Sequence, residues 1–161
     1  MNPHKFRLYL YALLSLALMG IIFWFSSQPA NRSQVLSDGL LYNILLILGF
    51  EDSAAMELYG KLIRKIAHFI EYAALGLSSG LFFIEYFRET VSPRSRGAFW
   101  AAGVCGLYAL SDEIHQSFVP GRSMQLSDVL LDCFGAVTAI FLLFALKNYI
   151  YSHREERKNF E

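Results

Sequence analysis

Eight ionisable side chains stand within or directly beside apolar segments of this 161-residue chain. A charged side chain at the centre of a membrane helix costs on the order of 2.5–3.5 kcal/mol on insertion scales, so such residues usually face the protein interior or water. Their spacing favours shared helix faces: Glu71 and Tyr72 follow His68 by three and four residues, and Asp132 follows Asp128 by four. The eight residues are His68, Glu71, Asp112, Glu113, His115, Arg122, Asp128 and Asp132.

Five carboxylates, two histidines and one arginine support three kinds of chemistry. Pro120 and Gly121 predict a tight turn that folds Arg122 back over the neighbouring helix ends, where it could hold a phosphate or another anionic group. A carboxylate beside a histidine could act as an acid–base pair. Carboxylates and histidines together could hold a divalent cation that bridges to phosphate.

No single reaction is favoured by the sequence. The chain contains no HExxH, CxxC, phosphate-loop or serine-nucleophile motif, so whether it is an enzyme stays open. For each residue alone, tying helices together is the more common role. The convergence of so many costly groups nevertheless favours a functional site.

Four apolar segments must position these residues. The composition (55% apolar and 17% charged residues, zero net charge) excludes a disordered chain and lacks the basic excess of a nucleic-acid-binding protein. Residues 8–25 contain no charge and would form about 27 Å of helix, close to the thickness of a hydrocarbon core. We predict an all-α integral membrane bundle of four transmembrane helices in one domain. The helices span about 8–25, 53–87, 97–115 and 127–150, with a tail at 151–161, and residues 35–50 form a short amphipathic or re-entrant helix in the first outer loop.

The distribution of lysine and arginine predicts the orientation. More of these residues flank the chain ends and the 88–96 connection than the other two connections. The positive-inside rule therefore places both termini in the cytoplasm and the polar residues at the outer ends of three helices.

At these residues the chain resembles the VanZ-like family of bacterial membrane proteins. The similarity lies in KIAHFIEYAALG (65–76), SDEIHQSFVPGR (111–122), Asp128 and the Asp132-x-x-Gly135 segment, and FSSQP (25–29) also looks like the family pattern. Asp132 departs from it, because asparagine is common there in the family. The resemblance implies a multi-pass protein of the bacterial cytoplasmic (inner) membrane, and the namesake is associated with resistance to glycopeptides, teicoplanin in particular.

We therefore expect an outward-facing site that binds or acts on an anionic envelope lipid or a cell-wall precursor and affects glycopeptide susceptibility. The expected partners are membrane lipids or a lipid-linked precursor and no nucleic acid, and the cofactor could be a divalent cation. Alternatives are a non-catalytic membrane factor that limits glycopeptide access to the surface, or a small proton-coupled transporter. The candidate catalytic residues are His68, Glu71, Asp112, Glu113 and His115, and the candidate substrate-binding residues are Lys65, Tyr72, Gln116, Arg122, Asp128 and Asp132.

Overall fold

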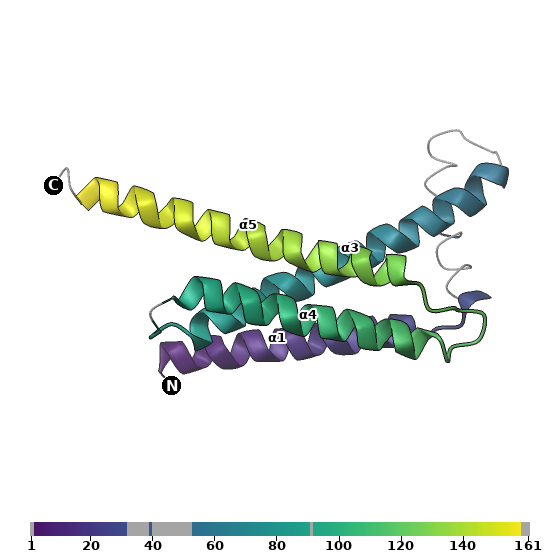
Figure 1. The fold of residues 1–161 in the computed structure, drawn as a ribbon, viewed down its shortest axis with the longest axis horizontal. Helices are drawn as coiled ribbons and strands as arrows, with labels where there is room; N and C mark the ends of the chain where they lie inside the picture. The colour runs from purple at the N-terminus through teal and green to yellow at the C-terminus, as the bar shows by residue number, and fades with distance from the viewer. Residues whose placement is uncertain (1, 32–38, 40–52, 91, 159–161) are drawn as a thin grey trace.

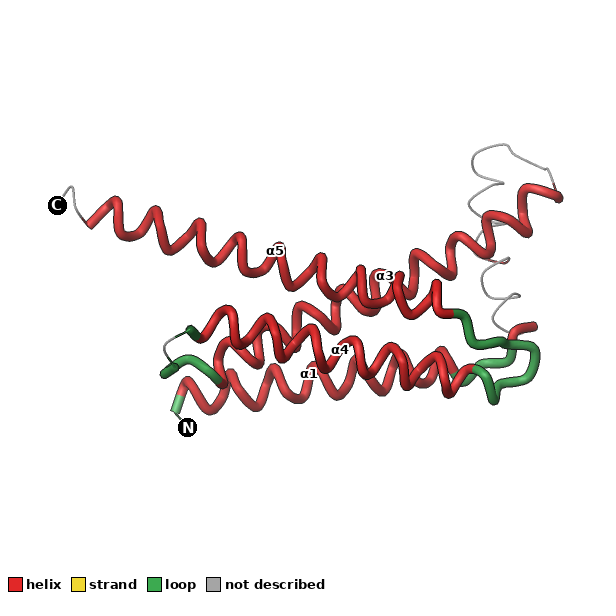
Figure 2. The backbone as a smooth tube through the Cα atoms, in the orientation of Figure 1, coloured by secondary structure: helices red, strands yellow, loops and turns green. Residues whose placement is uncertain are grey.

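This computed structural model describes residues 2–31, 39, 53–90 and 92–158, and most of these residues belong to four long helices (Figure 2). They are α1 (Pro3–Ser26), α3 (Ser53–Tyr86), α4 (Pro93–Gln116) and α5 (Leu126–Lys158). No strand occurs among these residues, so the prediction of an all-α chain is confirmed. The segment 35–50, for which we predicted an amphipathic or re-entrant helix, lies outside the described residues except for Gly39.

Local sequence features explain where the helices begin and end. The side chain of Asn2 accepts a hydrogen bond from the backbone N–H of His4 at 3.0 Å, which caps the start of α1. α4 begins at a proline, which needs no hydrogen-bond acceptor in a first turn. α5 continues to Lys158, so most of the predicted tail at 151–161 is helical, because neither glycine nor proline interrupts it.

Three of the described helices are long and apolar enough to cross a membrane: α1, Tyr59–Tyr86 of α3 and Leu126–Tyr151 of α5. Many of their bulky apolar side chains are exposed, as expected where lipid is the solvent. α4 is as long as α1 but less apolar, because Arg94 and Arg96 lie in its first turn and Asp112 and Glu113 near its end. The structure supports a multi-pass membrane protein, and the fourth span stays a prediction.

α3 is the central element: α3 and α4 each contact the other three described helices, and α3 packs the more extensively on both α1 and α5. α1, α4 and the second half of α3 run side by side, whereas α5 crosses α3 and diverges towards the C-terminus (Figure 1). Ile22, Tyr72, Leu75, Cys105 and Ala136 belong to the buried core. We call the end of the bundle that holds residues 117–125 the loop end, and the opposite end, with the starts of α1 and α4, the termini end.

Candidate functional site

A glycine lets α3 and α5 touch through their backbones at the loop end. A Cβ atom on Gly135 of α5 would lie 2.5 Å from the backbone oxygen of Phe69 in α3. Since His68 precedes Phe69 and Asp132 lies one turn before Gly135, this contact brings the two side chains together. His68 Nδ1 lies 3.7 Å from Asp132 Oδ1, which is longer than a hydrogen bond.

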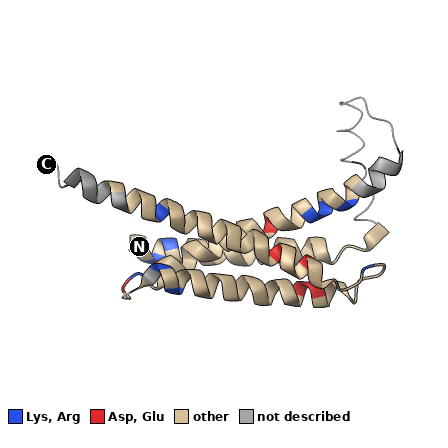
Figure 3. Ribbon diagram, turned by 45° about the horizontal axis from the view of Figure 1, so that its top comes forward, with Lys and Arg blue, Asp and Glu red and all other residues tan. Residues whose placement is uncertain are grey.

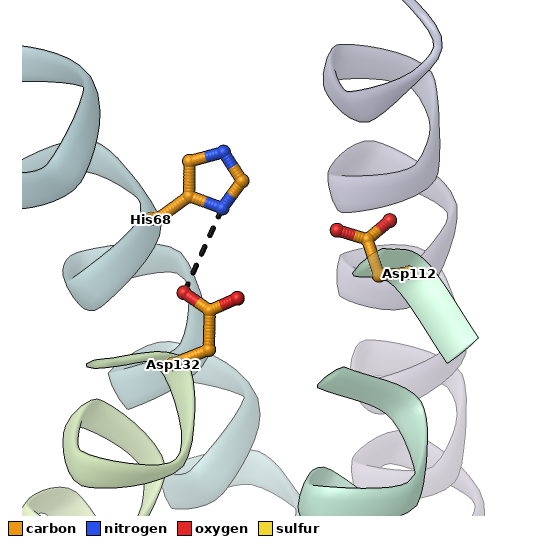
Figure 4. Close-up of side chains that lie close together, drawn as sticks. All are labelled: His68, Asp112 and Asp132. Atoms are coloured by element: carbon orange, nitrogen blue, oxygen red, sulfur yellow. Dashed lines mark ion pairs between the residues drawn. The ribbon is translucent and has the colours of Figure 1, made fainter. Parts of the chain in front are cut away.

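Asp112 of α4 faces this pair, as Figure 4 shows. Each of the three residues offers one donor atom, and these atoms all lie within 4.8 Å of one another. Both carboxylates are buried, with exposed fractions of 3% for Asp112 and 1% for Asp132. Asp112 Oδ1, both Asp132 oxygens and His68 Nδ1 lack a hydrogen-bond partner within the described part of the chain. Because unpaired buried charge is costly, stability alone does not account for these three residues, which we call the cation cluster.

The second oxygen of Asp112 is firmly held. Ser26 Oγ donates a hydrogen bond to Asp112 Oδ2 at 2.7 Å, and Gln116 Nε2 donates another at 3.0 Å. Ser26 is the last residue of α1, and Gln116 lies one turn beyond Asp112 on α4. The orientation of the Asp112 carboxylate therefore depends on both α1 and α4.

The loop at 117–125 folds Arg122 back over the ends of α1 and α4. Arg122 Nε donates to the backbone oxygen of Gln28 at 3.0 Å, Nη1 to Gln116 Oε1 at 2.8 Å and Nη2 to the backbone oxygen of Phe25 at 3.4 Å. Gly121 has a φ of +77°, a conformation that favours glycine, as the predicted turn requires. Burial lowers the pKa of the Arg122 guanidinium. The group stays charged because the ordinary pKa of arginine is so high.

These groups surround a pocket of about 450 Å³ at the loop end, within the range of roughly 300–1,000 Å³ of small-molecule sites. Figure 3 shows acidic residues gathered towards this end, next to the basic residues in the first half of α3. Two of the acids have partners: Lys65 Nζ lies 2.5 Å from Asp128 Oδ1, and the backbone N–H of Gln125 donates to Glu113 Oε1 at 2.6 Å. Among the described residues, the charged lining consists of Lys61, Arg64, Lys65, Arg122, Glu113, Asp128 and Asp132, joined by His68.

Most of the predicted site residues meet here. The lining includes Lys65, His68, Glu113, Gln116, Arg122, Asp128 and Asp132, and Asp112 belongs to the adjoining cation cluster. Glu71 is half-buried one turn after His68. Tyr72 is fully buried in the core, with its ring centroid 6.1 Å from that of Tyr108.

His115 lies outside the pocket lining and faces α1. Its Nε2 atom lies 3.1 Å from Ser27 Oγ, and its ring stacks on Phe23 with centroids 4.5 Å apart. Although His115 follows Asp112 by three residues, the two side chains contact different partners.

Sequence reasoning missed three residues of the site. Ser26 binds Asp112, and Lys61 and Arg64 line the pocket. A pattern for the latter two was present, because Lys61, Arg64, Lys65 and His68 follow one another at helical spacing and share a face. The Ser26–Asp112 contact joins residues 86 positions apart, and no local pattern predicts it.

The cation cluster offers the donor set of a divalent metal site. Imidazole nitrogen and carboxylate oxygen suit several divalent transition metals. The unpaired buried oxygens fit such an ion, because it would compensate their charge. His68 and Asp132 also line the pocket, so a ligand there could reach the ion.

Several helices are apolar enough to cross a membrane, and a polar pocket lies at one end of them. These two features place the chain in the class of multi-pass membrane proteins with a polar pocket at the end of the helix bundle. Within that class, the model of the VanZ/LLP1 family matches residues 11–147, and the chain belongs to this family. The resemblance found in the sequence is thereby confirmed. No curated protein and no solved structure matches the chain.

Proposed function

We propose that the pocket binds the phosphate-bearing headgroup of an anionic envelope lipid or lipid-linked cell-wall precursor, together with a divalent cation in the cation cluster. The observation that supports this function is a pocket lined by basic side chains that adjoins buried carboxylate oxygens without a hydrogen-bond partner among the described residues. Without a cation, Asp112 and Asp132 would repel a phosphate placed beside them. A divalent cation between the carboxylates and the phosphate would turn that repulsion into attraction. Phosphate binding would therefore need both the basic side chains and a cation in the cation cluster.

Arg122 and Arg64 are the proposed phosphate ligands. The Arg122 guanidinium uses three N–H groups on Gln28, Gln116 and Phe25, which leaves two of its five for a ligand. Arg64 lines the same pocket, and its Nη1 atom has no hydrogen-bond partner among the described residues. Arginine suits phosphate because its planar donors match two phosphate oxygens at once.

The position of the pocket suits a lipid. It lies where α1, α4 and α5 end or begin, so a headgroup can enter while its chains stay beside the apolar helices. Under the predicted orientation this end faces the outer leaflet. A bound divalent cation would polarise a phosphate oxygen, and such polarisation favours hydrolysis of phosphate esters. The experiment below therefore measures phosphate release as well as binding.

A direct test uses native mass spectrometry of the purified full-length protein with phosphatidic acid and with diacylglycerol of the same chains, with and without Mn²⁺. We expect Mn²⁺-dependent binding of phosphatidic acid alone, because the two lipids differ only in the phosphate. Arg64→Gln and Arg122→Gln should each weaken it about tenfold, the loss of one charge-assisted bond. Arg88→Gln removes an arginine at the termini end and should leave binding unchanged.

Equal binding of both lipids, or full binding by both pocket variants, would contradict the proposed function. The same samples are assayed for inorganic phosphate. Its Mn²⁺-dependent release would define an enzyme acting on phosphate esters, whereas saturable binding without release would define a binding protein. In a host that carries the gene, comparing teicoplanin susceptibility of the Arg64→Gln and Arg88→Gln strains tests the role that the family resemblance implies.

A further inference from the structure

The two oxygens of Asp112 are in contrasting environments. Oδ2 accepts hydrogen bonds from Ser26 and Gln116, whereas Oδ1 is buried and has no hydrogen bond from any described residue. A carboxylate with both oxygens free could rotate about its terminal torsion, which is a soft one. With Oδ2 held from two sides, Oδ1 is left as the oxygen available to the cation cluster.

The donor directions of this contact are fixed by chemistry. Arginine has only donors, so the oxygen of the Gln116 amide must face Arg122 and its NH₂ group must face Asp112. Gln116 Nε2 also donates to Ser26 Oγ at 3.3 Å, so the hydroxyl accepts from Gln116 and gives its one proton to Asp112. Two side chains, Ser26 and Gln116, therefore hold one carboxylate oxygen, and Arg122 fixes the orientation of the Gln116 amide.

We propose that Ser26 and Gln116 are positioning residues of the divalent-cation site, which hold Asp112 in the orientation that presents Oδ1 to the ion. The inference rests on the cation in the proposed function. It makes the last turn of α1 part of the site, although α1 supplies no member of the cation cluster. Removing an outer partner of a metal ligand typically lowers metal affinity 10–100-fold.

The neighbouring serine provides a matched control. Ser27 also joins α1 to α4, but its hydroxyl donates to the backbone oxygen of Phe23 at 2.6 Å and lies beside His115, not Asp112. Ser26→Ala and Ser27→Ala therefore delete the same atom one residue apart. Only the first deletion reaches the cation cluster.

The experiment is a Mn²⁺ titration of the purified full-length protein, followed by electron paramagnetic resonance, with the metal-free thermal midpoint recorded for each variant. We expect Ser26→Ala to weaken Mn²⁺ binding at least about tenfold. Gln116→Met, which keeps the side-chain length and removes the donor, should do the same. Ser27→Ala should stay within about twofold of wild type, the range of a residue without a link to the ligands.

The outcomes separate this inference from the proposed function. If the wild type does not bind Mn²⁺, the cation of the proposed function is absent. If the wild type binds Mn²⁺ and Ser26→Ala and Gln116→Met bind it equally well, the positioning role alone is wrong. The positioning role would also be overturned if Ser27→Ala lost as much Mn²⁺ affinity as Ser26→Ala. The same holds if the Mn²⁺ affinities of all variants simply followed their metal-free thermal midpoints, because both results indicate general destabilisation.

Discussion

Both ends of the bundle place acidic side chains near basic ones, but the acids differ in burial and in the partners that they have. At the termini end, Glu85 Oε1 lies 2.6 Å from His4 Nδ1 and accepts hydrogen bonds from Arg7 Nη2 at 2.9 Å and Nε at 3.2 Å. At the loop end, three carboxylate oxygens of Asp112 and Asp132 accept no hydrogen bond from a described residue, and the nearest basic atom, His68 Nδ1, lies 3.7 Å from Asp132 Oδ1.

The difference separates a structural contact from a site. Glu85 ties the start of α1 to the end of α3, and its charge is compensated within the protein. In the cation cluster, His68 forms an ion pair with Asp132, but one histidine faces two buried carboxylates, so a bound cation would complete the compensation of their charge. Substitution at the two ends should therefore affect different properties, ligand binding at the loop end and stability at the termini end.

The largest effect is expected for Asp112→Asn, which should lower Mn²⁺ affinity at least about 100-fold, beyond the usual loss for an outer partner. Ser26 and Gln116 would hold the amide oxygen in the place of Oδ2, so the NH₂ group would point at the cation. The metal-free thermal midpoint should hold or rise, because an unpaired buried charge is removed. Paramagnetic resonance and differential scanning fluorimetry measure the two quantities, and a midpoint that falls with the affinity would contradict the distinction between the ends.

Glu85→Gln should give the opposite result. Loss of the charge weakens the bonds from His4 and Arg7 and should lower the thermal midpoint modestly, because solvent screens a contact in which Arg7 is exposed. Mn²⁺ affinity should not change, since the cation cluster lies at the other end. Reduced Mn²⁺ binding at a temperature where this variant is fully folded would show that the two ends are coupled.

Gly135→Ala should lower stability and also affect the site, with a smaller loss of Mn²⁺ affinity than Asp112→Asn. Its Cβ atom would lie 2.5 Å from the backbone oxygen of Phe69, which cannot give way as a flexible side chain does, so we expect a loss of stability of at least about 3 kcal/mol, the upper end of the usual cost of overpacking. His68 would also shift relative to Asp132, so Mn²⁺ affinity should fall. Gly103→Ala is the matched control on α4, because no described atom lies within 4 Å of the added Cβ. If Gly135→Ala and Gly103→Ala had the same stability and the same Mn²⁺ affinity, the α3–α5 contact would not position His68 relative to Asp132.

The sequence was sufficient to predict the helices and many of the residues that line the pocket. One uncharged run close to the thickness of a bilayer core and three further apolar segments predicted the helices. The polar residues near the ends of three of these segments predicted a site at one level of the bundle. Helix ends were predicted less well, because hydropathy marks the end of the apolar segment and not the end of the helix. Backbone hydrogen bonds let a helix such as α5 continue beyond that point.

The remaining errors concern helix faces and distant contacts. Asp112 and His115 are three residues apart, a rotation of about 300°, so their side chains diverge by about 60° on α4. That rotation is enough for His115 to meet Ser27 and Phe23 while Asp112 meets the cation cluster. The bond from Ser26 to Asp112 depends on how α1 packs on α4, which spacing within either helix does not determine.

The backbone contact at Gly135 also has a mechanical consequence. Where two helix backbones touch directly, no side chains between them can rearrange when one helix moves, because protein interiors are close-packed. His68 and Asp132 should therefore move together as one wall of the pocket. Arg122 lines the same pocket from the separate loop at 117–125, so a headgroup larger than the resting pocket would have to displace that loop and break the hydrogen bonds of Arg122 rather than separate α3 from α5.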